Sequence, residues 1–428
     1  MTAGVTSAES TSAAPVPAVP VRNSTRGAWI NVVVAAVLMV ATLPGRTQGL
    51  GLITEPLLRD LQLDRLTYAQ LNLWATLLGA AACLPAGWLF DRHGLRWPTA
   101  LILLLLGGTV WCLSEATGSV AILFVLLLLT RALGQSALSV ASITTVGKSF
   151  RENSGLAMGV YAVLLSVFFM AAFVVIGGVV SQLGWRLAWL EVTVFLLVAV
   201  VPLTLLFLRE PRPVENTTAT TDLTGLTLRA ALSEPSFWVF AGATALFGLA
   251  SSGLGLFNEA VLAERGFDQP TYHKFLAATA LISLPGQFLC GWLATRVPLP
   301  RLLAVAMLLY AFGLLALPAI HSLAALWLIA AVVGVSGGMI AVLFFAVWGQ
   351  AFGQRELGRI QGAAQMLTVF ASAVGPLLFA AGHEWRHSYA PALWTLAACV
   401  VAIGLVAWRV KMPAPPAAAS APLPPANA

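Results

Sequence analysis

Long apolar runs separated by short polar stretches form the main pattern of this chain. A helix needs about 20 mostly apolar residues to cross a hydrocarbon core of about 30 Å, and runs of that length recur along the whole sequence. The runs are solidly apolar and do not alternate with a period of two, so they predict membrane-spanning helices and not the strands of a membrane barrel. We expect twelve spans, at residues 28–57, 67–90, 97–114, 119–149, 155–180, 187–208, 237–262, 273–295, 301–319, 323–349, 358–381 and 389–410.

The composition supports a membrane protein. Of 428 residues, 59% are hydrophobic and only 9% are charged, whereas soluble proteins carry roughly 25% charged residues. Residues 1–26 are rich in Ala, Pro, Ser and Thr without an apolar core, and residues 411–428 are rich in Pro and Ala. We therefore expect both segments to be disordered cytoplasmic tails. The four cysteines all lie inside apolar runs without metal or disulfide spacing, so neither a metal site nor a cofactor is expected.

Positive charge predicts the orientation, because lysine and arginine are retained in short cytoplasmic loops. Placing both termini inside leaves 15 of the 23 Lys and Arg residues in the cytoplasm, six outside and two within spans. The sequence thus predicts a multi-pass protein of the cytoplasmic membrane whose termini are both cytoplasmic. The net charge of +6 follows from this bias, so it does not indicate a nucleic-acid partner.

The chain also contains an internal repeat. The segment GLGLITEPLLRDLQLD at 49–64 returns as GLGLFNEAVLAERGFD at 253–268, with seven identities at an offset of 204 residues. The same offset carries GWLFDRHGL at 87–95 onto GWLATRVPL at 291–299. Two parallel six-helix repeats are typical of transporters that rock around a central site. We expect an N-terminal bundle at 27–208, a cytoplasmic linker at 209–236 and a C-terminal bundle at 237–410.

The segment GWLFDRHGLR at 87–96 resembles the loop signature of the major facilitator superfamily. The resemblance implies an all-helical fold of twelve transmembrane helices in two six-helix repeats, and a conformational latch in which Asp91 meets Lys148 or Arg151 and the start of span 11 near Gly358. A carboxylate at a helix end can face the positive N-terminus of another helix. The residues expected to form the latch are Gly87, Asp91, Arg92, Gly94, Arg96 and Arg151.

Three further segments refine the resemblance. RALGQSA in span 4 resembles the second signature of the family, which keeps Arg131 but leaves a role for Gln135 open. Span 5 lacks the Gly-Pro pair of many drug/proton antiporters. FRENSGLAMG at 150–159 and FGQRELGRIQG at 352–362 resemble the bacterial branch of monocarboxylate and oxalate/formate carriers.

Two arginines lie inside spans. Arg46 follows Pro44 and Gly45 in span 1, where a helix break is expected, and Arg131 lies at a similar depth in span 4. A charged side chain in the bilayer centre costs at least about 2.5 kcal/mol, and the spans offer no acidic residue at that depth. The counter-charge can therefore arrive with the substrate, and a guanidinium suits a carboxylate. Alternatively, either arginine could bond carbonyl groups or pair with Glu55 or Glu259 as packing glue.

Other candidates complete the predicted site. Glu55 and Glu259 occupy equivalent positions of the repeat and could carry a coupling proton. Four residues in the later spans could line the substrate cavity: Gln287, Trp348, Gln361 and Gln365. We expect a monomer in the lipid bilayer that binds a small anionic molecule and a proton.

These observations favour a secondary transporter of a small organic anion, coupled to protons. An exporter of drugs or a carrier of neutral solutes is the alternative within that class, and a membrane sensor that does not transport is the alternative outside it. The spans hold no convergent acid, base, nucleophile or metal groups, so an enzyme with catalytic residues is not expected. No phosphate-binding Gly-rich loop is present for ATP.

Overall fold

A computed structural model of the chain describes residues 25–117, 119–150, 154–210 and 225–413. Helices account for nearly all of this part, and no β-strand lies in it beyond one isolated bridge between Gly225 and Gly353. The first half contains α1 (Thr25–Val40), η1 (Leu43–Gly45), α2 (Thr47–Asp60), α3 (Arg65–Ala80), α4 (Cys83–His93), α5 (Arg96–Ser114), α6 (Val120–Thr130), η2 (Arg131–Leu138), α7 (Ser139–Ser149), α8 (Ser154–Leu183), α9 (Trp185–Val194), η3 (Phe195–Val200) and α10 (Val201–Phe207). The second half contains α11 (Leu228–Ser233), α12 (Pro235–Ala263), α13 (Gln269–Leu293), α14 (Leu299–Ala316), η4 (Leu317–Ala319), α15 (Leu323–Phe352), α16 (Leu357–Arg386) and α17 (Ala390–Arg409).

These helices form twelve segments that are long and apolar enough to cross a membrane, which confirms the predicted number. Several spans consist of more than one helix. The first joins α1, η1 and α2, and the fourth joins α6, η2 and α7. Away from helix ends and prolines, the backbone N–H and C=O groups of a helix bond to one another within the segment, as a bilayer requires.

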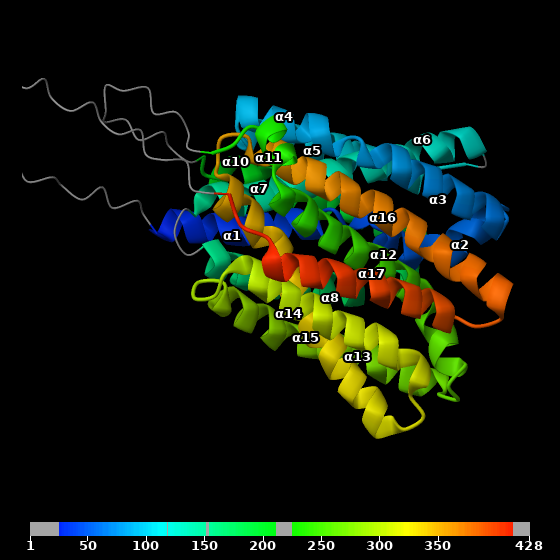
Figure 1. Cartoon of the computed structure of the whole chain (residues 1–428). Coiled ribbons are helices and arrows are strands. Elements are labelled where there is room, and N and C mark those ends of the chain that lie inside the picture. Colours follow the sequence, from blue (N-terminus) through cyan, green and yellow to red (C-terminus); the bar gives the residue numbers. More distant parts are fainter. Residues whose placement is uncertain (1–24, 118, 151–153, 211–224, 414–428) are drawn as a thin grey trace, which may run out of the picture.

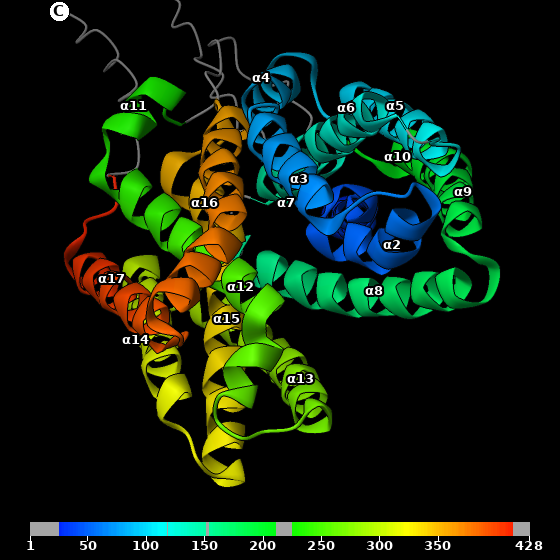
Figure 2. The same ribbon diagram turned by 90° about the vertical axis from the view of Figure 1, so that its right-hand side faces the viewer.

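Two main hydrophobic cores hold the molecule together. One is built from residues 34–208 and the other almost entirely from residues 231–407. In the second core, α14 packs against α15 and α17, and α12 packs against α16. Figure 2 shows the helices of the first half and those of the second half as two groups side by side. Burying apolar surface separately within each half leaves the contact between the halves free to change.

The two halves meet closely on one side of the molecule. This side, here called the terminal side, is where α1 begins and α17 ends (Figure 1). Every hydrogen bond between the halves of the described chain lies in the portion of the spans nearer this side. Glycines permit the approach: a Cβ atom on Gly87 would lie 2.2 Å from the carbonyl oxygen of Gly358, and one on Gly291 would lie 2.8 Å from Cα of Gly159.

The repeat is visible in the caps on the opposite side. Asp64 accepts a hydrogen bond from the N–H of Thr67 at the start of α3, and Asp268, 204 residues later, does the same for Thr271 at the start of α13. Bonds to Thr67 hold the pKa of the Asp64 carboxyl below its ordinary value, and bonds to Thr271 do so for Asp268. Equivalent sequence positions thus start equivalent helices.

Candidate functional site

Span 1 is broken in the middle. After α1 the chain makes a turn and the short 3-10 helix η1, and Arg46 then takes an extended conformation with φ −94° and ψ 151° before α2 begins. Pro44 lies at the start of η1 and has no N–H to donate. Gly45 is required by packing, because a Cβ there would lie 2.2 Å from the carbonyl oxygen of Thr130. The break expected at Pro44 and Gly45 is confirmed.

A π-helical segment of span 4, η2, lies against this break. The wider turn of a π-helix is rare and is frequently found at functional sites. It begins at Arg131, whose side chain is only 2% exposed. Nη1 of Arg131 donates to the Gly45 carbonyl at 3.0 Å, to Thr47 at 3.1 Å and to Oε1 of Gln135 at 2.8 Å. Nη2 donates to Oδ1 of Asn72 at 3.0 Å. Arg131 therefore joins the break in span 1 to spans 2 and 4.

The Arg46 side chain is less enclosed. Its Nε donates to Thr42 at 2.6 Å, and its Nη2 donates to the sulfur of Met39 at 2.8 Å and to Ser139 at 3.1 Å. The guanidinium also lies 5.5 Å from the ring centre of Phe169 on α8. Nη1 of Arg46 donates no hydrogen bond within the described part of the chain. The neighbouring atoms do not enclose this nitrogen completely. One edge of this guanidinium is thus available to a ligand.

Neither arginine is neutralised by a carboxylate in the described part of the chain. Among the residues that the structure describes, no ion pair includes Arg46 or Arg131. Their partners are neutral hydroxyl, amide, carbonyl and thioether groups. Arg131 donates to the carbonyl of Gly45, the residue before Arg46, so both arginines belong to the break in span 1. Two positive charges, one at the break in span 1 and one in the segment of span 4 that lies against it, form a site that can bind an anion.

Glu55 and Glu259 lie on matching helix faces. Both are exposed, on α2 and α12, four residues after Gly51 and Gly255. No heavy atom lies within 4 Å of the place a Cβ would take on either glycine, so these faces border open space. No ion pair joins Glu259 to Arg46 or Arg131 in the described chain. One part of the packing alternative is observed, since Arg131 donates to the Gly45 carbonyl.

The predicted glutamines lie where the halves meet. Gln287 on α13 exchanges hydrogen bonds with Ser166 on α8, at 3.0 and 3.3 Å. Oε1 of Gln361 on α16 accepts from Thr144 on α7 at 2.5 Å. Gln365, one helical turn further along α16, is 8% exposed. In this conformation Gln287 and Gln361 bridge the halves and are not grouped with the arginines.

Trp348 does not line a cavity, which corrects the expectation from sequence. Its side chain is fully buried in the core of the second half. The indole packs among the rings of Phe237, Phe344 and Phe352, with centroids 5.5 to 6.1 Å away. Aromatic rings at such distances stabilise a core by packing, so this tryptophan serves the fold.

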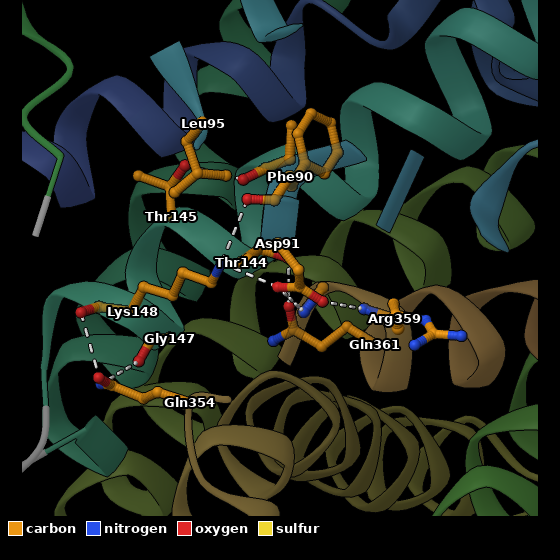
Figure 3. A network of polar contacts seen from close by, with 12 residues as sticks. Phe90, Asp91, Leu95, Thr144, Thr145, Gly147, Lys148, Gln354, Arg359 and Gln361 are labelled. Atoms are coloured by element: carbon orange, nitrogen blue, oxygen red, sulfur yellow. Dashed lines mark hydrogen bonds and ion pairs between the residues drawn. The ribbon is translucent and has the colours of Figure 1, made fainter. Parts of the chain in front are cut away.

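Asp91 forms the principal polar contact between the halves (Figure 3). Its carboxylate accepts the backbone N–H of Gly358 at 3.0 Å and that of Arg359 at 2.9 Å, both at the N-terminus of α16. Nζ of Lys148 lies 2.8 Å from the same carboxylate. The first N–H groups of a helix lack partners and carry partial positive charge. Asp91 therefore supplies the missing acceptor from the other half, with the contacts that the family resemblance implies.

Three other residues expected in the latch have contacts within the first half. Gly94 has φ +77°, and the turn that follows donates the N–H groups of Leu95 and Arg96 to Glu210, each at 3.0 Å. Arg92 lies over the ring of Trp88 at 5.3 Å, close to its own helix. Arg151 lies outside the described residues.

Sequence reasoning missed several partners of the arginines. Asn72 is an isolated amide in an apolar run, and Ser139 and Thr42 are small hydroxyl residues that are common in packed spans. The signal that could have identified Gln135 is its spacing of four residues from Arg131, which puts both on one helix face. Phe169 carried no signal, because phenylalanine is ordinary in a membrane span.

A protein family model and several solved structures match this chain. The family model described as Major Facilitator Superfamily matches residues 29–376, with a further match over 241–427. The sequence matches no curated protein. Several solved structures are similar in fold. The human organic anion transporter MFSD10 (TETRAN) is 17% identical, with 89% of this chain and 98% of that chain covered and a TM-score of 0.66.

The second structure is the transporter FucP in the outward conformation. It is 15% identical, with 91% of this chain and 99% of that chain covered and a TM-score of 0.63. The third is the proton:xylose symporter XylE, at 12% identity, 90% and 95% coverage and a TM-score of 0.65. At these identities the likeness concerns the fold alone.

Proposed function

Because the chain belongs to the Major Facilitator Superfamily, whose members are transporters and not enzymes, we propose that it moves a small organic anion across the membrane by alternating access. Arg46 binds the carboxylate of this anion. The observation that carries the proposal is the pair of mid-span arginines, which have no carboxylate partner among the residues that the structure describes. Within that part of the chain, Nη1 of Arg46 is unpaired.

The two arginines have different roles in this proposal. Arg131 already donates four hydrogen bonds to neutral groups, so it fixes the break in span 1 and adds positive potential. Arg46 presents Nη1 toward a ligand while Thr42 and Ser139 hold its other nitrogens. A carboxylate oxygen at Nη1 gains a charge-assisted bond, and exclusion of water strengthens it.

We further propose that the terminal side is cytoplasmic and that this conformation faces outward. The excess of lysine and arginine on that side supports the orientation. Closure by Asp91, Gln361 and Gln287 on the terminal side leaves the substrate to enter from the opposite side. FucP, whose structure is described as outward, shares the fold.

Proton coupling is proposed through Glu55 and Glu259. Both lie exposed on the opposite side of the molecule at equivalent positions of the repeat, on faces that border open space. A carboxylate that is protonated outside and deprotonated inside can couple proton movement to the anion. XylE, a structural neighbour, is described as a proton symporter. Membership of the monocarboxylate and oxalate/formate branch stays a prediction from the two segments at 150–159 and 352–362.

The test is transport into proteoliposomes. Purified full-length protein is reconstituted into liposomes that are loaded with unlabelled monocarboxylates, dicarboxylates, sugars or cationic dyes. Counterflow of the labelled compound is then measured with and without a pH gradient. We expect flux of a carboxylate. Arg46→Gln should lower its affinity at least about tenfold, since a hydrogen bond to a charged group contributes about 1.5–3 kcal/mol, and Arg46→Lys should retain part of it.

Arg186→Gln is the matched control, because Arg186 is bonded to carbonyl groups of the loop at Ser114 and Ala116, away from Arg46. If Arg46→Gln transports the carboxylate with unchanged affinity, Arg46 is not its ligand. If only sugars or dyes are exchanged, the proposed substrate class is wrong. Binding without flux for every compound would indicate a sensor. Loss of the pH-gradient effect in Glu55→Gln or Glu259→Gln identifies the coupling group.

A further inference from the structure

A groove of about 500 Å³ lies on the terminal side, between the short helix α11 and the start of α16. Its wall combines two arginines, Arg229 and Arg359, with the hydroxyl residues Thr227 and Ser233. Leu228 and Leu232 provide the apolar part of the wall. This mixture of cationic, hydroxyl and apolar groups distinguishes the groove from the arginine site inside the first half.

The groove is held in place by the rest of the second half. The N–H of Leu226 donates to the carbonyl of Phe352 at 2.8 Å, and the N–H of Leu228 donates to Glu356 at 2.7 Å. Glu356 also forms an ion pair with Arg359 at 3.0 Å. The segment that leads into α11 is therefore bonded to the loop before α16. These bonds hold the two walls of the groove in position.

Positive charge exceeds negative charge in the groove. Glu356 is the one acidic residue among the described residues of its wall, and it is already paired with Arg359. Arg229 is exposed and forms no ion pair among the described residues. Guanidinium groups bind phosphate oxygens with paired hydrogen bonds. The charge of the groove thus suits a phosphate group.

The groove also lies at the level of a membrane surface. Span 7 begins at Pro235, directly after α11, and Trp238 in its first turn is 52% exposed. The indole nitrogen of Trp238 donates to the carbonyl of Leu232 at 2.8 Å. Exposed tryptophans at span ends typically lie among lipid headgroups, and Figure 2 shows α11 at the outer edge of the second half.

We propose that this groove binds the headgroup of an anionic phospholipid. The lipid phosphate contacts Arg229 and Arg359, and the glycerol region rests on Leu228 and Leu232. A headgroup there touches the same helix end that Asp91 caps, since the N–H of Arg359 donates to Asp91 at 2.9 Å. The proposal is independent of which substrate is transported.

The experiment measures lipid binding to the purified full-length protein by native mass spectrometry and by thermal unfolding in detergent. The probes are phosphatidylglycerol, phosphatidylcholine and free glycerol phosphate, each titrated separately. We expect saturable binding of phosphatidylglycerol, at least about tenfold weaker binding in Arg229→Gln and in the double variant with Arg359→Gln, and tighter binding in Glu356→Gln, which removes the competing charge while keeping an acceptor.

Arg355→Gln is the matched control, because Arg355 is exposed in the same loop but outside the groove. It should bind phosphatidylglycerol as the natural chain does. Since Arg229 is exposed, Arg229→Gln is expected to fold even if the double variant does not. Unchanged affinity in Arg229→Gln, or equal affinity for phosphatidylcholine, overturns the proposal. Equal affinity for glycerol phosphate alone would mean that a free phosphate compound, and not a lipid, is the ligand.

Discussion

Replacing Asp91 with Asn should open the terminal side. The Asp91 carboxylate makes two kinds of contact, and only one of them joins the two halves. Its ion pair with Lys148 connects α4 and α7 within the first half, so it persists whether the halves are together or apart. Its bonds from the N–H groups of Gly358 and Arg359 exist only when the terminal side is closed.

The size of the effect follows from these two bonds. A net contribution of about 1.5–3 kcal/mol is usual for a hydrogen bond to a charged group. The amide of the variant has one acceptor oxygen, so it can keep one bond, now uncharged, while its NH₂ group faces the second donor. We expect the closed state to lose about 2–3 kcal/mol, which changes the ratio of closed to open molecules by about 30- to 150-fold.

The assay is double electron–electron resonance between spin labels placed on opposite halves. Trp97 and Arg355 are exposed on the terminal side in the first and second half, respectively, and both would be replaced with cysteine. The exposed native thiols of Cys112 and Cys399 would be replaced with serine. Asp91→Asn should shift the distance distribution toward longer separations.

Asp60→Asn is the control. The Asp60 carboxylate accepts from the indole of Trp185 at 2.7 Å and lies 3.5 Å from Nε of Arg186, all within the first half. The same chemical change there should leave the distances as they are. If a folded Asp91→Asn protein gives the distribution of the natural chain, the two bonds to α16 do not stabilise closure and the reasoning fails.

Two glycine substitutions test close approach between and within the halves. Gly87→Ala places a Cβ about 2.2 Å from the carbonyl oxygen of Gly358. The distances between the same spin labels should therefore lengthen, while the thermal unfolding temperature should change little. Unaltered distances would contradict a tight contact between the halves. Gly45→Ala places a Cβ 2.2 Å from the carbonyl oxygen of Thr130, and because that clash lies inside one half, overpacking should cost about 1–3 kcal/mol of folding stability. Thermal unfolding in detergent measures it, and an unchanged transition temperature would count against the packed break.

Much of the architecture could be predicted because it depends on local properties. The twelve apolar helices follow from run length, and equivalent helix starts at Asp64 and Asp268 follow from the repeat at 204 residues. The break in span 1 was also predictable, since Pro44 removes a donor and Gly45 removes a side chain. In each case the signal lies in the segment that shows the structure.

Other features depended on neighbours that are distant in sequence. Trp348 was expected beside the substrate, but the rings around it fill the core of the second half. A tryptophan in a span has the same local pattern in either place. The π-helical turn that begins at Arg131 was likewise not predicted, and it lies against the break in span 1.

The sequence by itself determined that this protein crosses the membrane twelve times and that two arginines lie within spans. A helix in lipid satisfies its backbone hydrogen bonds within one segment. The number of membrane crossings therefore follows from the length and apolarity of each run. Only the tertiary structure decided that Arg131 donates four bonds to neutral groups, and that Nη1 of Arg46 donates none within the described part of the chain. Their bonds to Asn72 and Ser139 span 59 and 93 residues, and no local pattern specifies partners that folding brings together from different spans.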